Sequence, residues 1–82
     1  MIGHINILNS IIWPFPLYRP ENCSIFFMFL SLLKNRVDFR PHQTGGGTVI
    51  LEFHSQSDLM LAKDIFSKTI DRRRNVTIQP VL

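Results

Sequence analysis

A nine-residue run at positions 25–33, IFFMFLSLL, is apolar except for one serine. A membrane-spanning helix needs about 20 such residues, so this run is only about half of a membrane span. Projected on a helix it is apolar on nearly every side, whereas docking on a sheet needs a stripe only about 100° wide. A chain of 82 residues is too small to enclose such a helix completely. The run therefore predicts a helix whose surplus apolar surface must be covered by something else.

The composition predicts one folded domain spanning residues 1–82. With 45% hydrophobic and 18% charged residues, the chain is too apolar for intrinsic disorder. Its single cysteine cannot form an internal disulfide, and residues 1–12 carry no Lys or Arg to begin a signal peptide. We therefore expect an intracellular protein, cytoplasmic or nuclear. The net charge of +3 permits a polyanionic partner without requiring one.

Alternation and helical periodicity predict six elements. β-Branched residues indicate a strand over residues 4–12, and Pro20-Glu21-Asn22 and Lys34-Asn35-Arg36 delimit a helix. A short strand at 37–40 runs up to Pro41, which can end a strand or occupy an edge, and glycines 45–47 form the turn into a strand at 48–53. Ser55 or Ser57 caps a second helix, whose apolar stripe is Leu59, Ala62, Phe66 and Ile70. A last strand is expected at 76–79.

The resulting order, βαββαβ, predicts an α+β ferredoxin-like fold, in which two helices cover one face of a four-stranded antiparallel sheet. The side chains expected to face the helices are Ile5, Ile7, Val37, Phe39, Val49, Leu51, Phe53, Val76 and Ile78. The open face is then expected to carry Asn6, Leu8, Asp38, Arg40, Thr48, Ile50, Glu52, Thr77 and Gln79.

Three segments resemble an RNA recognition motif domain. Residues 46–53 (GGTVILEF) are similar to that family's octamer, residues 5–9 (INILN) to its first-strand hexamer, and residues 57–62 to the start of its second helix. The family places base-stacking aromatics where this chain has Asn6, Thr48 and Ile50. Stacking contributes roughly 1–3 kcal/mol per base, so the resemblance implies the family's fold with its usual RNA surface disabled.

The surplus apolar surface points to protein-protein contact as the function. Residues 13–18 (WPFPLY, the proline loop) add large side chains on a stiff backbone just before the first helix. The candidate partner-binding residues are Trp13, Phe15, Tyr18, Phe26, Phe27, Phe29 and Leu30. Three interpretations remain open: the loop is a lid over the protein's own core, it contacts a second copy or another protein, or it lies on a membrane surface.

The alternative function is binding of RNA or DNA through basic side chains. The candidates are Arg36, Arg40, Arg72, Arg73 and Arg74, which would contact phosphates without reading sequence. The other interpretation, which the small net charge favours, is that these residues are solvated and keep an apolar protein soluble.

No pattern in the sequence indicates catalysis or a metal. His4, His42, His54 and Cys23 do not follow the spacing of a structural zinc site. We expect His42 and His54 to be solvated and Cys23 to be an inert, half-buried thiol. The sequence thus predicts a non-enzymatic protein without catalytic residues, metal, cofactor or small-molecule substrate.

Overall fold

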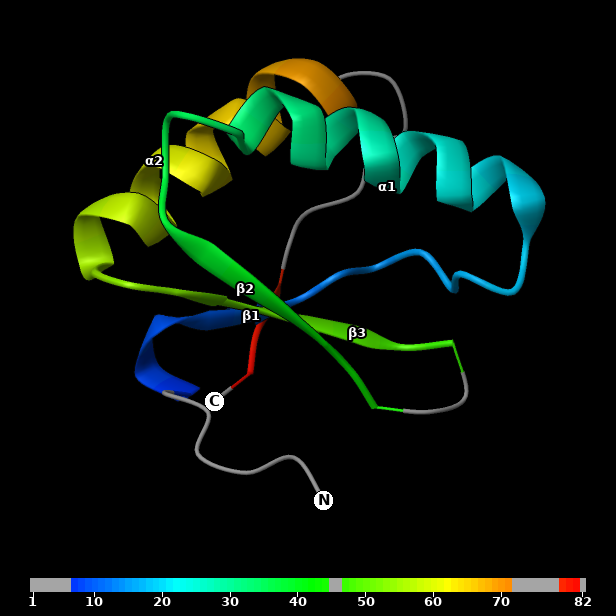
Figure 1. Ribbon diagram of the computed structural model, residues 1–82, viewed down its shortest axis with the longest axis horizontal. Helices are drawn as coiled ribbons and strands as arrows, with labels where there is room; N and C mark the ends of the chain where they lie inside the picture. The colour runs from blue at the N-terminus through cyan, green and yellow to red at the C-terminus, as the bar shows by residue number, and fades with distance from the viewer. Residues whose placement is uncertain (1–6, 45–46, 72–78, 82) are drawn as a thin grey trace.

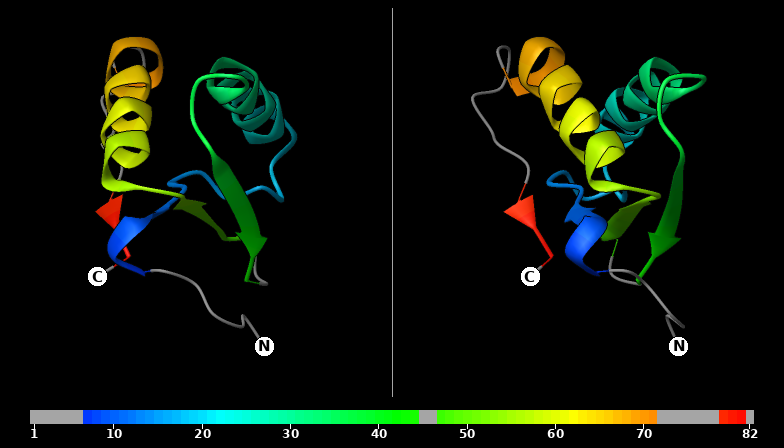
Figure 2. Two further views of the ribbon diagram at one scale, coloured as in Figure 1. Left: turned by 60° about the vertical axis from the view of Figure 1, so that its left-hand side comes forward. Right: turned by 90° about the vertical axis from the view of Figure 1, so that its left-hand side faces the viewer.

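The computed structural model describes residues 7–44, 47–71 and 79–81, except for the side chains of residues 71 and 79. These residues form two helices and an antiparallel sheet. In chain order the elements are a 3-10 turn (Ile7–Asn9), β1 (Ser10–Ile12), α1 (Pro20–Leu33), β2 (Phe39–Gln43), β3 (Val49–Phe53), α2 (Gln56–Phe66), a π-helical turn (Ser67–Asp71) and β4 (Gln79–Pro80). Both helices lie on the same face of the sheet (Figures 1 and 2). The protein is therefore α+β, as the sequence predicts.

The strand β3 is central in the sheet. It pairs antiparallel with β2 on one side and with β1 on the other, and the two-residue β4 pairs with the far side of β1. Leu51 lies opposite Pro41 of β2 and Ile11 of β1. Of the predicted strand at 76–79, only residue 79 is among the described residues.

The first strand is shorter than predicted. Residues 7–9 form a 3-10 turn, and the strand begins only at Ser10, so the predicted strand over 4–12 is wrong at these positions. The amide of Gln56, at the start of α2, donates a hydrogen bond to the Leu8 carbonyl (2.7 Å) and another to Oδ1 of Asn9. Ile7, predicted to face the helices, is instead 43% exposed. A distant partner thus holds a turn where the local alternation favours a strand.

The second strand continues through Pro41. It spans Phe39–Gln43, whereas the sequence predicts a strand at 37–40. β2 forms one edge of the sheet. Proline is tolerated at an edge because its nitrogen can face the side of the strand that has no neighbour, where no ladder hydrogen bond is needed.

The boundaries predicted for α1 are confirmed. Pro20 occupies the first turn, where its missing N–H is harmless, and Glu21 places negative charge at the positive end of the helix dipole. The helix ends at Leu33, and Asn35 adopts a left-handed backbone conformation with φ 69°. Asparagine is one of the few residues that accepts this conformation, so the helix stops here.

The core fills the layer between sheet and helices. Val49, Leu51 and Phe53 point into it from β3, as predicted, and the stripe Leu59, Ala62, Phe66 and Ile70 is fully confirmed. Val37 and Phe39 pack against this core while remaining half-buried. The buried hydrophobic residues are Ile11, Trp13, Phe15, Phe26, Phe29, Leu33, Val49, Leu51, Phe53, Leu59, Ala62, Ile65, Phe66 and Ile70.

Candidate functional site

Trp13 joins the proline loop to both helices. Its ring lies 5.2 Å from the Phe26 and Phe29 rings of α1 and 5.7 Å from the Phe66 ring of α2, measured between centroids. Phe15 packs edge-on against the indole at 5.4 Å. Only 2% of Trp13 is exposed. The first part of the loop is therefore a lid over the core.

Hydrogen bonds hold the proline loop in place. The peptide N–H groups of Trp13 and Leu17 donate to the carbonyls of Val49 (2.9 Å) and Gly47 (3.0 Å). From α1, the buried amide of Asn22 donates to the Pro16 carbonyl (2.9 Å), and the Cys23 thiol donates to the Leu17 carbonyl (3.1 Å). Cys23 is half-buried, as expected. The role of Asn22 was not predictable from the sequence, since a polar residue in a first helical turn is normally solvated.

The seven candidate partner-binding residues divide into three groups by their burial. Trp13, Phe15, Phe26 and Phe29 are buried in the core, which corrects their assignment as contact residues. Leu30 is half-buried and packs against the core. Tyr18 and Phe27 are 69% and 63% exposed, respectively. Of the predicted surface, the structure therefore leaves these two side chains available to a partner.

The exposed side of α1 and Lys34, the residue directly after the helix, together form what we call the outer face. It consists of Glu21, Ser24, Phe27, Met28, Ser31 and Lys34. Met28 is 39% exposed beside Phe27, and the Ser31 hydroxyl donates to the Phe27 carbonyl at 2.9 Å. No charged residue lies between Glu21 and Lys34 on this face. The outer face is therefore an apolar centre between two polar ends.

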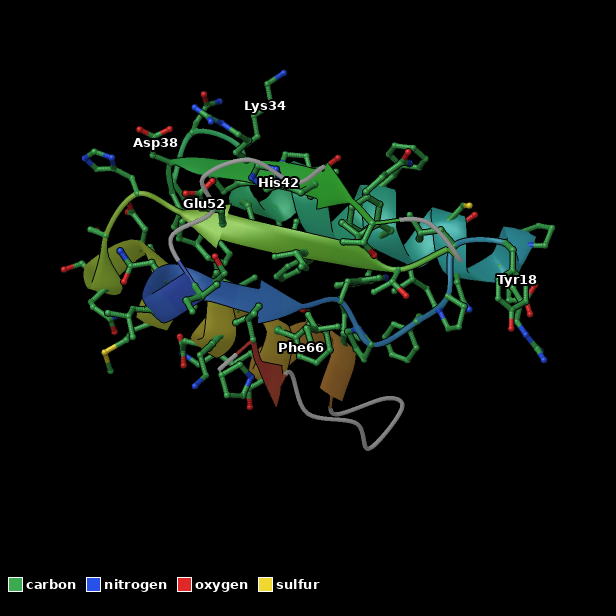
Figure 3. The ribbon with its side chains drawn as sticks, turned by 90° about the horizontal axis from the view of Figure 1, so that it is seen from below. Tyr18, Lys34, Asp38, His42, Glu52 and Phe66 are labelled. Carbon is green, nitrogen blue, oxygen red and sulfur yellow. The ribbon has the colours of Figure 1, made fainter. Side chains whose placement is uncertain are left out.

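Tyr18 lies beyond the amino end of α1, at one extremity of the molecule (Figure 3). Its ring lies against Gly47, where an added Cβ would be 2.9 Å from Tyr18 Cδ1. Gly47 also has φ +81°, so both its conformation and its close neighbour require glycine. Tyr18 is thus held in position although most of it is exposed.

The open face of the sheet contains a hydrogen-bonded pair, His42 and Glu52, that was not predicted from the sequence. Nε2 of His42 lies 2.9 Å from Oε1 of Glu52, and both side chains are about one-fifth exposed, at 21% and 17% (Figure 3). The prediction of a solvated His42 is therefore wrong. Because β2 continues through Pro41, His42 is paired with β3. It lies directly opposite Ile50 and diagonally across from Glu52.

A shallow pocket of about 360 Å³ lies where β2 begins and β3 ends. It is lined by Asp38, Phe39, Arg40, Glu52, Phe53 and His54. His54 is exposed, as predicted. Arg40 is also exposed, and it shares the pocket with the carboxylates of Asp38 and Glu52. Thr48 and Ile50, where the RNA recognition motif has aromatics, lie exposed and half-buried, respectively.

Of the five basic candidates, two are among the described residues. Arg36 is exposed in the turn after α1, whereas Arg40 is on β2. Arg72, Arg73 and Arg74 lie outside the described residues. The described residues contain no group of three or more His, Cys, Asp or Glu side chains able to hold a metal ion.

The described helices are all too short or too polar to cross a membrane. Comparison with family models, with curated proteins and with solved structures found no match. The functional interpretation of this chain therefore starts from its own residues.

Proposed function

We propose that this protein is a non-catalytic binding module that contacts another protein chain through the outer face of α1, with Tyr18 as a flanking contact. The observation that carries the proposal is Phe27, which is 63% exposed at the centre of a helix face that has no charge for three turns. Burying a phenylalanine side chain contributes about 1.5–3 kcal/mol, and aromatic residues are enriched in the cores of interfaces. A partner that covers Phe27 would gain this contribution to its binding free energy.

The other helix serves as a comparison. Met60 of α2 is 67% exposed and Leu61 41%, but the exposed side of α2 also carries Lys63 and Asp64, and Lys68 follows in the π-helical turn. Single exposed apolar residues among charges are normal on protein surfaces. The outer face of α1 differs because its two exposed apolar side chains, Phe27 and Met28, are flanked by serines and not by charged residues.

A ferredoxin-like fold, close to that of the RNA recognition motif, is part of the proposal. The sheet order β2-β3-β1-β4 and the two helices on one face support it, although β4 is only two residues long. In such a fold the helical layer faces away from the open sheet. Protein contact through α1 would leave the sheet face free.

Photo-crosslinking tests the proposed contact. Benzoylphenylalanine replacing Phe27 should yield one defined protein adduct in cells that express the protein, because the probe would lie inside an interface. The same probe replacing Met60, which is equally exposed, should yield none above background. Equal labelling from both positions, or no adduct from position 27, would reject the outer face of α1 as a binding surface.

Nucleic-acid binding remains the second candidate because Arg36 and Arg40 are both exposed. Asp38 and Glu52 beside Arg40 oppose phosphate, so we rank it below protein contact. Replacing Arg72, Arg73 and Arg74 by Ala should lower any affinity for single-stranded RNA and flatten its dependence on salt. Fluorescence anisotropy at low salt is the measurement, and the absence of binding by the unmodified protein would end this candidate function.

A further inference from the structure

The outer face of α1 is symmetric about its own centre. Its members occur at positions 21, 24, 27, 28, 31 and 34, spaced equally on either side of the point between Phe27 and Met28. Glu21 and Lys34 occupy the two ends, and Ser24 and Ser31 the intermediate positions. A two-fold axis through the centre would therefore place the acidic end of one helix against the basic end of the other, serine against serine, and apolar residue against apolar residue. This symmetry points to a particular partner for the surface proposed above.

We propose that the partner is a second copy of this chain, with the two α1 helices packed antiparallel across a two-fold axis near Phe27 and Met28. This inference rests on the proposed binding function and specifies its partner. Glu21 of each copy meets Lys34 of the other, so the ion pair forms twice. Ser24 meets Ser31, and Phe27 meets Met28, around the axis.

Charge and shape both favour this arrangement. Opposite charges face each other at both ends, and antiparallel helices also oppose their dipoles favourably. A parallel pair would instead place Glu21 against Glu21 and Lys34 against Lys34. Serines on either side of the apolar centre allow the helices to approach closely, and the Ser31 hydroxyl already donates to its own helix.

One existing contact competes with the proposed ion pair. Glu21 Oε1 lies 3.9 Å from Arg19 Nη1, with the two side chains 58% and 62% exposed. A long, exposed ion pair of this kind contributes little, so exchanging it for Lys34 of the second copy costs little.

The helix length sets the expected affinity. The 14 residues of α1 extend over about 21 Å, which places a single helix pair at the small end of specific interfaces. We therefore expect a reversible dimer with a dissociation constant in the micromolar range, at roughly 1–100 µM. The outer face lies opposite the buried residues of α1, and both helices cover the same face of the sheet (Figure 2), so the dimer would leave the open faces of both sheets uncovered.

Charge exchange tests the antiparallel pairing. Glu21→Lys and Lys34→Glu should each weaken self-association about tenfold in sedimentation, because each turns two attractions into two repulsions. The double variant should return to within about threefold of the original protein. Circular dichroism of each variant verifies that α1 is intact. A protein that stays monomeric at about 500 µM, or single variants without effect, would overturn this inference.

Cysteine pairing provides a geometric test that does not depend on charge. In a Cys23→Ser background, a mixture of the Ser24→Cys and Ser31→Cys variants should crosslink with a short bismaleimide, while each variant alone should not. Crosslinking of each variant with itself would indicate a parallel pair and reject the inference. If both tests fail while benzoylphenylalanine at position 27 still captures a different protein, the proposed binding function stands and only the second copy is excluded.

Discussion

Phe27 and Phe29 show how two similar residues in one helix acquire opposite roles. Phe29 is fully buried against Trp13 and Phe66, whereas Phe27 is 63% exposed. Trp13 brings the loop into the same cluster, although its Nε1 has no hydrogen-bond partner among the described residues. An unmade hydrogen bond costs about 1–3 kcal/mol. Contacts with four aromatic rings outweigh that cost.

Replacing each phenylalanine by glutamate separates the two roles. Phe29→Glu should unfold the domain, because an unpaired charge would be buried in the core. Phe27→Glu should stay folded, with a free energy of unfolding within about 1 kcal/mol of the original monomer. Urea denaturation at low protein concentration measures both. A folded Phe29→Glu variant would contradict the placement of this ring.

At the scale of elements, the two helices use their faces differently. The second helix has one buried stripe opposite a charged side, as expected of a helix packed on a sheet. In contrast, α1 buries Asn22, Phe26, Phe29 and Leu33 and keeps an apolar centre on its outer face. The loop covers part of the surplus that the sequence indicates, and the remainder is the proposed interface.

The start of α2 gives a prediction at this scale. The Ser55 hydroxyl accepts a hydrogen bond from the Asp58 peptide N–H at 3.2 Å, whereas Ser57 is exposed in the first turn. Ser55→Ala should lower the free energy of unfolding by about 1 kcal/mol, since an N-cap is lost. Ser57→Ala is the matched control and should change it by less than about 0.5 kcal/mol. A larger effect at Ser57 would reverse the cap assignment.

At the scale of the whole molecule, self-association and stability are linked. A dimer that forms only from folded chains stabilises them by mass action, so the melting temperature rises with protein concentration. Between about 2 and 200 µM, a gain of about 1 kcal/mol would raise the melting temperature of a domain of this size by about 4–8 °C.

The Phe27→Glu variant should melt at the same temperature at both concentrations, and Met60→Glu should behave like the original protein. Differential scanning fluorimetry at the two concentrations is the measurement. A melting temperature independent of concentration in the original protein would argue against a dimer in this range.

Much of the fold was predictable because local sequence patterns determine the bounds of α1 and the buried face of β3. Pro20 and Asn35 mark the ends of α1, and residues of β3 alternate strictly between core and open face. The candidate site was predictable only in part. The apolar run at 25–33 indicated surplus surface, and helical spacing placed Phe27 beside the serines of the polar side. The predicted contact surface nevertheless included Phe26 and Phe29, because nearly the whole run is apolar.

The amino-acid sequence by itself determined where α1 begins and ends, which residues of α2 and β3 are buried, and that apolar side chains exceed what a sheet face needs. These properties depend on neighbours within a few positions, where propensity, capping and alternation act. Only the tertiary structure decided that Trp13 is core while Tyr18 is surface, that Gln56 holds residues 7–9 in a turn, and that His42 reaches Glu52. Those outcomes depend on contacts between distant segments, which form only when the chain has folded.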